Sequence, residues 1–74
     1  MQKLPLLSGR NVAKVFEHLG WEVARQRGSH IILVKKGHIA TLSVPDYHEV
    51  DRGTLRSLIA RANTIVEEFL SVMK

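Results

Sequence analysis

The fold of this chain is decided by one stretch of sequence, Trp21-Glu22-Val23-Ala24-Arg25-Gln26-Arg27-Gly28-Ser29-His30-Ile31-Ile32-Leu33-Val34. Trp21, Val23 and Arg25 alternate with the residues between them, which is typical of a strand with a period of two. Gly28-Ser29 suits a tight turn, and residues 30–35 are rich in the β-branched side chains that favour a returning strand. The stretch therefore predicts a β-hairpin with a histidine next to its turn.

An amphipathic helix is predicted before this hairpin. Apolar side chains recur there at the i, i+3, i+4, i+7 spacing of one helical stripe, at Val12, Val15, Phe16 and Leu19. Ser8 or Asn11 is the candidate N-cap of the helix. Gly20 is placed to end it in the left-handed conformation that glycine tolerates.

A third strand and a second helix are predicted after the hairpin. Lys36-Gly37 indicates another tight turn, and His38 to Val44 alternates as a strand that Pro45 stops. A second helix follows Gly53 and is ended by Asn63, which tolerates left-handed geometry. Its apolar stripe is formed by Leu55, Leu58, Ile59 and Ala62.

A short third helix is predicted at the C-terminus. Thr64 and Glu67 have the spacing of a capping box, which would open it. Two apolar sets on this helix are open to dock on the body or on a partner, either Val66, Leu70 and Met73 or Ile65 and Phe69.

Together these elements predict an α+β fold of order αβββα with an added short C-terminal helix. The three strands form an antiparallel sheet, and the two amphipathic helices must bury their stripes on one of its faces. The other face stays open for a ligand. Residues 30–35 have apolar side chains at both odd and even positions, so either face of this strand could be the buried one. The sequence therefore leaves undecided whether His30 points to the helices or to the open face.

Length and composition limit the classes of protein that fit. At 74 residues we expect one domain spanning residues 1–74. The absence of cysteine excludes disulfides, thiolate zinc sites and thiol nucleophiles. The histidines are not spaced as metal ligands, so neither a metal nor another cofactor is expected. The longest apolar run after residue 10, Ile31–Val34, is too short to cross a bilayer, and residues 1–10 make a poor signal peptide, so we expect a cytoplasmic protein without membrane contact.

The positive charge of the chain is concentrated in its middle third. The formal net charge is +4, and residues 23–45 contain four Lys or Arg residues and no acid. A basic patch of this kind attracts polyanions through counterion release. The alternative interpretation of the charges alone is an ordinary solvated face.

The residues around the hairpin turn suggest RNA chemistry. Histidine exchanges protons near pH 7, so His30 can act as a general acid or base. Arg25 and Arg27 lie beside it in the sequence, and the planar guanidinium matches the oxygens of phosphates.

Several stretches over residues 4–71 match a known family in order and in spacing, namely Leu4–Gly9, Arg25–His30, Val44-Pro45, Gly53–Ile59 and Glu67–Leu70. In these stretches the chain resembles the HicA toxins, which are RNA-cleaving proteins of type II toxin–antitoxin pairs. The resemblance implies a double-stranded-RNA-binding-domain-like fold and endoribonuclease activity on messenger RNA, that of an mRNA interferase. It also implies a HicB-type antitoxin as the partner that silences the toxin.

The family's catalytic histidine follows a Gly-Ser pair, which carries over to His30. Many relatives have a second histidine directly after it, where this chain has Ile31. Metal-independent cleavage needs one group to remove a proton and another to donate one, so His48 is the candidate for the second group. The side chains expected to hold RNA or its phosphates are Arg25, Arg27, Ser29, Lys35, Lys36 and Arg56. Arg56 is included because it is near a helix N-terminus, where backbone N–H groups favour anions.

Two other functions remain open at this point. A fold of this type also serves in RNA-binding modules that do not catalyse a reaction. An inactive toxin relic that only binds its antitoxin is the second alternative.

Overall fold

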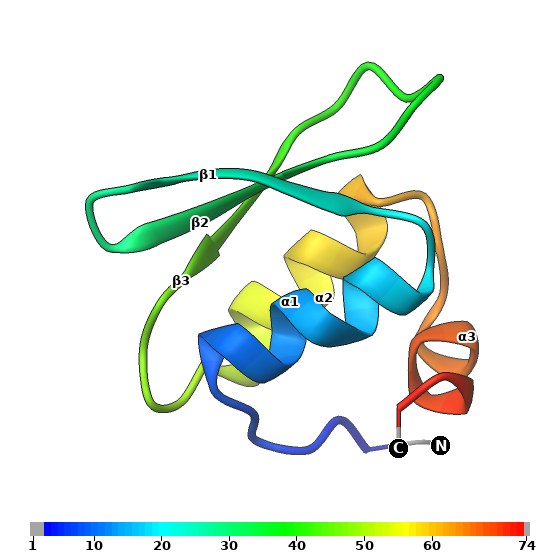
Figure 1. The fold of residues 1–74 in the computed structure, drawn as a ribbon. Coiled ribbons are helices and arrows are strands. Elements are labelled where there is room, and N and C mark those ends of the chain that lie inside the picture. Colours follow the sequence, from blue (N-terminus) through cyan, green and yellow to red (C-terminus); the bar gives the residue numbers. More distant parts are fainter. Residues whose placement is uncertain (1–2, 74) are drawn as a thin grey trace.

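Three antiparallel strands and three helices make up residues 3–73, the part of the chain that the computed structural model describes. In chain order they are α1 (Gly9–His18), β1 (Glu22–Arg27), β2 (His30–Val34), β3 (Leu42–Pro45), α2 (Arg52–Arg61) and α3 (Val66–Ser71). The strands lie side by side in the order β1-β2-β3, and the helices cover one side of this sheet (Figure 1). The predicted α+β fold is confirmed, and the arrangement agrees with the double-stranded-RNA-binding-domain-like fold that the resemblance implies.

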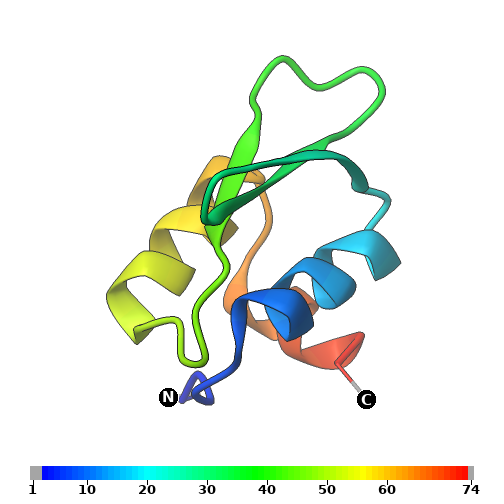
Figure 2. The ribbon, with the colours of Figure 1, turned by 60° about the vertical axis from the view of Figure 1, so that its left-hand side comes forward.

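The pairing register decides which side chains of the sheet face the helices. Ile31 pairs with Val44, and Leu33 pairs with Leu42. All four side chains are buried in the core that the helices cover. Because successive side chains of a strand point to opposite faces, His30 belongs to the other face, which the three helices of residues 3–73 leave uncovered (Figure 2). The structure thus settles the orientation that the sequence left undecided.

An aromatic cluster at the centre of the core joins the helices to the sheet. The ring of Phe16 on α1 meets Trp21 edge-on, with centroids 6.5 Å apart, and meets Phe69 on α3 at 5.3 Å. All three rings are buried. Edge-on aromatic pairs are favourable beyond the area that they bury. The C-terminal helix therefore docks on the body through Phe69.

Other apolar residues of the C-terminal segment divide between the core and the solvent. Those that pack against the core are Val66, Leu70, Val72 and Met73. Ile65, in contrast, is 60% exposed. The capping box predicted at Thr64 and Glu67 is wrong, because Ile65 is the N-cap of α3 and the Thr64 hydroxyl donates to the Glu68 carboxylate.

The third strand is shorter than the sequence suggests. It runs from Leu42 to Pro45, whereas the alternation predicted a strand from His38 to Val44. The cause is the position of His38, whose ring packs against Trp21 with centroids 4.9 Å apart. Its Nδ1 also accepts a hydrogen bond from the Ala40 N–H at 3.2 Å. These contacts hold the start of the predicted strand away from the ladder, and residues 35–41 form a loop that protrudes from the sheet (Figure 1).

The helix ends follow local capping chemistry. Ser8 is the N-cap of α1, and its hydroxyl accepts from the Asn11 N–H at 3.2 Å. Gly20 and Asn63 have positive φ angles of 99° and 59°, as predicted for residues that end the first and second helices. The second helix begins at Arg52, two residues earlier than expected, because Asp51 is its N-cap.

One glycine permits a close approach between α1 and the end of β3. A Cβ atom built on Gly9 would lie 2.0 Å from the carbonyl oxygen of Pro45. The N–H of Gly9 donates to the Tyr47 carbonyl at 2.9 Å. Only glycine fits this contact, which ties the first turn of α1 to the segment that leaves the sheet.

Candidate functional site

His30 and Arg27 lie directly opposite each other on the open face of the sheet. They are the pair of β1 and β2 residues that flank the Gly28-Ser29 turn. Side chains of directly opposed residues project to the same face with Cβ atoms about 4.5–5.5 Å apart. Arg27 is exposed and His30 is half-buried. The structure therefore places the side chains of Arg27 and His30 next to each other on one face, at the tip of the hairpin.

A β-bulge brings Arg25 to the same face. The register shifts between Val23 and Arg25, so that Val23 opposes Leu33 while Arg25 opposes Ile32. The sequence alternation had put Val23 and Arg25 on one face, and this prediction is wrong because the extra residue Ala24 reverses the parity. Arg25 and Arg27 are then two residues apart on the open face, about 7 Å along the strand.

The turn between the strands is open to solvent. Gly28 has a φ of 59°, and a Cβ built on it meets no atom within 4 Å. Ser29 is exposed, and its carbonyl accepts from the Asp46 N–H at 2.7 Å. Ser29 thus presents its side chain to solvent directly before His30 in the chain.

Lys35 and Lys36 lie at the opposite end of β2 from His30. Five residues of extended chain separate His30 from Lys35, which corresponds to about 17 Å. Lys35 lies beside the end of α1, since its Cε is 3.2 Å from a Cβ built on Gly20. The structure does not bring these two lysines to the imidazole.

Arg56 lies on α2, in the helical layer. It is exposed, and α2 packs against β3 from the side opposite to the open face. The N-terminus of α2 already holds an anion of this chain, because Asp51 accepts from the Thr54 N–H at 3.3 Å and from the Thr54 hydroxyl at 2.5 Å. The hydrogen bond from the Thr54 hydroxyl is the largest cause that lowers the pKa of Asp51 below its ordinary value, and the bond from the Thr54 N–H adds to it. The helix N-terminus is therefore not free to receive a phosphate beside Arg56.

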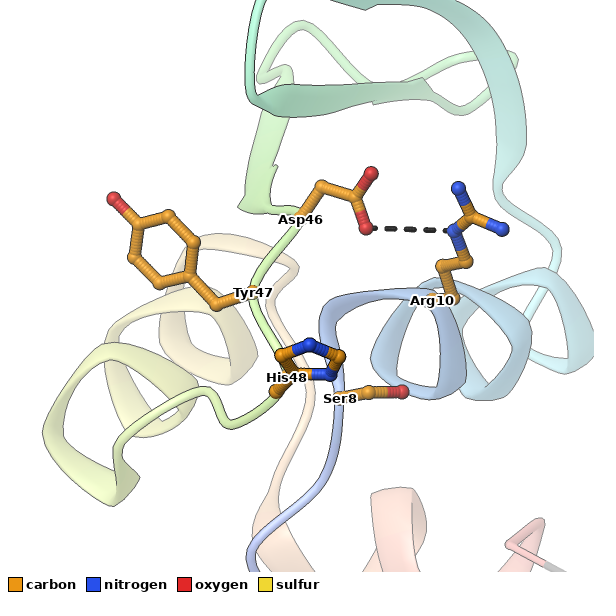
Figure 3. Close-up of a pocket in the computed structure, with 5 residues that line it drawn as sticks. All are labelled: Ser8, Arg10, Asp46, Tyr47 and His48. Atoms are coloured by element: carbon orange, nitrogen blue, oxygen red, sulfur yellow. Dashed lines mark ion pairs between the residues drawn. The ribbon is translucent and has the colours of Figure 1, made fainter.

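His48 lines a hollow on the helix side of the sheet (Figure 3). The other residues that line it are Ser8, Arg10, Asp46 and Tyr47. Ser8 and Arg10 belong to the start of α1, which covers the face opposite to that of His30. The structure thus places the two candidate proton-transfer groups, His30 and His48, on different sides of the sheet.

The two remaining histidines have other surroundings. His18 is exposed on α1, and His38 packs against Trp21. Within residues 3–73, no group of three or more His, Cys, Asp or Glu residues is arranged to hold a metal ion. The same part of the chain has no helix with the length and apolar character that a membrane span requires.

Two residues near the turn were not identified from the sequence. The Gln26 side-chain amide donates to the Asp46 carboxylate at 2.9 Å, beneath the turn that carries His30. The two residues are 20 positions apart, and neither belongs to a motif that would link them. Only the pairing of the three strands brings them together.

The open face thus combines one imidazole with two guanidinium groups, next to a turn that is exposed to solvent. An imidazole can move a proton, and the guanidinium groups can hold the oxygens of a phosphate next to it. The arrangement suits the binding of a phosphodiester chain and a proton transfer on it.

Comparison with known proteins identifies the family of the chain. Residues 9–64, most of the chain, match the family described as HicA toxin of bacterial toxin-antitoxin. Neither the comparison with curated proteins nor that with solved structures finds a match. The matched range includes the hairpin, the open face and the two main helices. The chain belongs to the HicA toxin family and is a toxin of a toxin–antitoxin system.

Proposed function

We propose that this toxin is an endoribonuclease that cleaves messenger RNA without a metal ion and uses His30 as its catalytic residue. The observation that carries the proposal is the direct opposition of His30 and Arg27 on the face that the helices leave open. The family adds to it, because ribonuclease activity is what membership implies. An RNA strand that crosses this face meets a proton-transfer group and a phosphate-binding group at one point.

The reaction is an intramolecular attack within the RNA. The 2′-hydroxyl loses its proton, its oxygen bonds to the adjacent phosphorus, and the bond to the 5′-oxygen breaks. The departing 5′-oxygen takes up a proton, so the products are a 2′,3′-cyclic phosphate end and a 5′-hydroxyl end. His30 moves a proton in this sequence, and Arg27 stabilises the charge that builds on the phosphate oxygens.

The other candidate residues are proposed in supporting roles. Arg25 holds a neighbouring phosphate, and the Ser29 hydroxyl orients the phosphate or the imidazole. Lys35, Lys36 and Arg56 contact more distant parts of a long RNA. His48 remains the candidate for the second proton-transfer group, and we expect His48→Ala to lower the cleavage rate less than His30→Ala because the two residues lie on different sides of the sheet.

The partner is proposed to be a HicB-type antitoxin that covers the open face. Its acidic or apolar side chains would meet Arg25, Arg27 and Ile32, which opposes Arg25 across the sheet. In a toxin–antitoxin complex, His30 and Arg27 should therefore lose their exposure to solvent. A complex in which both side chains stay as exposed as in the free toxin would contradict this part of the proposal.

The test of the proposal is RNA cleavage by purified protein in the presence of EDTA. Cleavage of a long single-stranded messenger RNA should yield 2′,3′-cyclic phosphate ends. His30→Ala should lower the rate by at least about 100-fold, the smallest effect typical of a general acid or base. His18→Ala is the matched control, since it removes an exposed histidine from α1 and should leave the rate unchanged.

The outcomes separate the proposal from its alternatives. If the protein binds RNA but does not cleave it, and His30→Ala binds equally well, the chain is an RNA-binding module. If it does not cleave RNA and any RNA binding depends only weakly on salt, the chain is an inactive relic that only binds its antitoxin. Loss of cleavage in His30→Ala alone supports the ribonuclease.

A further inference from the structure

We propose that Asp46 is a positioning residue for the tip of the β1–β2 hairpin, residues 27–30, which carries Arg27 and His30. The inference rests on the proposed function, because it concerns the geometry of that site. Asp46 follows β3 directly and comes from a segment 16 residues beyond His30. It contacts the tip from the helix side of the sheet, while the imidazole lies on the open side.

Packing of apolar side chains does not hold this tip in place. All six residues of β1 are exposed, and so are Gly28 and Ser29. A Cβ built on Gly28 meets no atom within 4 Å, so among the described residues no side chain packs over this position of the turn. A segment with so few buried contacts depends on its polar contacts for a fixed position.

Asp46 supplies these polar contacts through both its backbone and its side chain. Its N–H donates to the Ser29 carbonyl at 2.7 Å. Its carboxylate accepts from the Gln26 side-chain amide at 2.9 Å, and the same amide makes a longer contact of 3.5 Å with the Gly28 carbonyl. Asp46 is thereby linked to β1 on one side of the tip and to the turn itself.

Asp46 is itself held by the body of the protein. The preceding residue, Pro45, is buried and opposes His30 in the sheet, and the carbonyl of the following residue, Tyr47, accepts from the Gly9 N–H at 2.9 Å. The Asp46 side chain is only 19% exposed. Arg10 approaches its carboxylate from α1 at 3.5 Å (Figure 3), but the Arg10 side chain is 78% exposed and such an ion pair contributes little. The hydrogen bonds of Asp46 therefore connect the exposed tip to a fixed point.

The test compares four variants in the cleavage assay, each at a temperature below its own melting transition. Asp46→Ala and Gln26→Ala should each lower kcat by about tenfold or more while KM changes little, because small displacements of reacting groups are costly. Asp46→Asn should restore most of kcat, since its amide oxygen can accept from Gln26. The matched control is Glu49→Ala, which removes an exposed carboxylate three residues further along and should have the rate of the wild type.

A second readout follows the imidazole directly. NMR signals of the His30 ring should shift or broaden in Asp46→Ala and Gln26→Ala, and should resemble those of the wild type in Asp46→Asn and Glu49→Ala. The double variant Gln26→Ala/Asp46→Ala should lower kcat and shift the His30 signals no further than either single variant, because both substitutions remove the same hydrogen bond.

The two readouts separate the failure of this inference from the failure of the proposed function. An unchanged kcat and unchanged His30 signals in Asp46→Ala would overturn the positioning role. A loss of kcat in Asp46→Ala that Asp46→Asn does not restore, or that Glu49→Ala shows as well, would also overturn it. If the wild-type protein does not cleave RNA, the proposed function fails. The NMR comparison then decides alone, with displaced His30 signals in Asp46→Ala supporting the positioning role and unchanged signals overturning it.

Discussion

At the scale of single residues, Gly9 is the glycine at which an added Cβ would meet the closest contact. Gly9→Ala would put a methyl group 2.0 Å from the Pro45 carbonyl oxygen, and a backbone atom cannot turn away as a side chain can. We expect a loss of about 3 kcal/mol of unfolding free energy, the upper part of the usual range for overpacking. Urea unfolding followed by circular dichroism measures it.

Gly28→Asn is the control for this prediction. Gly28 also has a special backbone, with a φ of 59°, but a Cβ meets nothing there and asparagine tolerates the left-handed conformation. The variant should unfold at nearly the urea concentration of the wild type. Equal stability of Gly9→Ala and the wild type would show that α1 and the end of β3 can move apart.

The N-cap of α2 makes stability depend on pH in the acid range. The pKa of Asp51 is lowered from 3.8, chiefly by the hydrogen bond from the Thr54 hydroxyl. The stabilisation by the ionised carboxylate is therefore complete above the pKa of the unfolded chain and is lost as the pH falls through the lower pKa of the folded state. Asp51→Asn keeps a capping side chain without this titration. The melting temperature of this variant should match that of the wild type more closely at pH 3 than at pH 6. The same difference in melting temperature at pH 3 and at pH 6 would contradict a pH-dependent stabilisation by Asp51.

At the scale of elements, Phe69 is the buried side chain by which α3 docks on the body. Phe69 is buried against Phe16, and Phe69→Ala should cost about 3–5 kcal/mol, as is usual when a buried aromatic ring is deleted. Ile65→Ala is the matched control, because Ile65 lies at the start of the same helix but is 60% exposed, and its loss should stay within about 0.5 kcal/mol. Urea midpoints of the two variants measure the difference. Equal midpoints would mean that α3 contributes nothing to the fold.

The elements also show how far the sequence alone can lead. Their type and order could be predicted because the apolar periods are local properties of the chain. The face of His30 could not, because Ile32 on the open face is as apolar as Ile31 and Leu33 beneath it. Ile32 is only 8% exposed, since it belongs to the central strand and has a neighbour on each side. A central strand therefore hides the alternation that reveals an edge strand.

Other errors arose from contacts that are distant in sequence. The start of the predicted third strand is held off the ladder by the contact of His38 with Trp21, and the bulge at Ala24 is visible only in the register with β2. The link between Gln26 and Asp46 spans 20 positions. Among the candidate site residues, the prediction groups Lys35 with Arg27 because both belong to one basic segment of the sequence. In the structure, the length of the extended strand β2 separates the two side chains.

At the scale of the whole molecule, one basic face should govern the binding of RNA. For single-stranded nucleic acid, the logarithm of the binding constant falls with the logarithm of salt concentration by about 0.7 per phosphate neutralised. Arg27→Ala should reduce this slope by about 0.7, while Lys14→Ala, which removes an exposed cation from α1 on the helix side, should not change it. Fluorescence anisotropy at several salt concentrations measures both slopes. Equal reductions in the two variants would mean that RNA does not select the open face.

The close contact at Gly9 has a consequence for the genetics of this toxin. A glycine codon cannot change its amino acid by a single base without adding a side chain, so every missense mutation at this codon places a Cβ against the Pro45 carbonyl. Cells that lose the antitoxin and survive should therefore carry mutations in codon 9 as well as in codon 30. Sequencing the toxin gene in such survivors should reveal variants that are inactive because they do not fold, although His30 is unchanged.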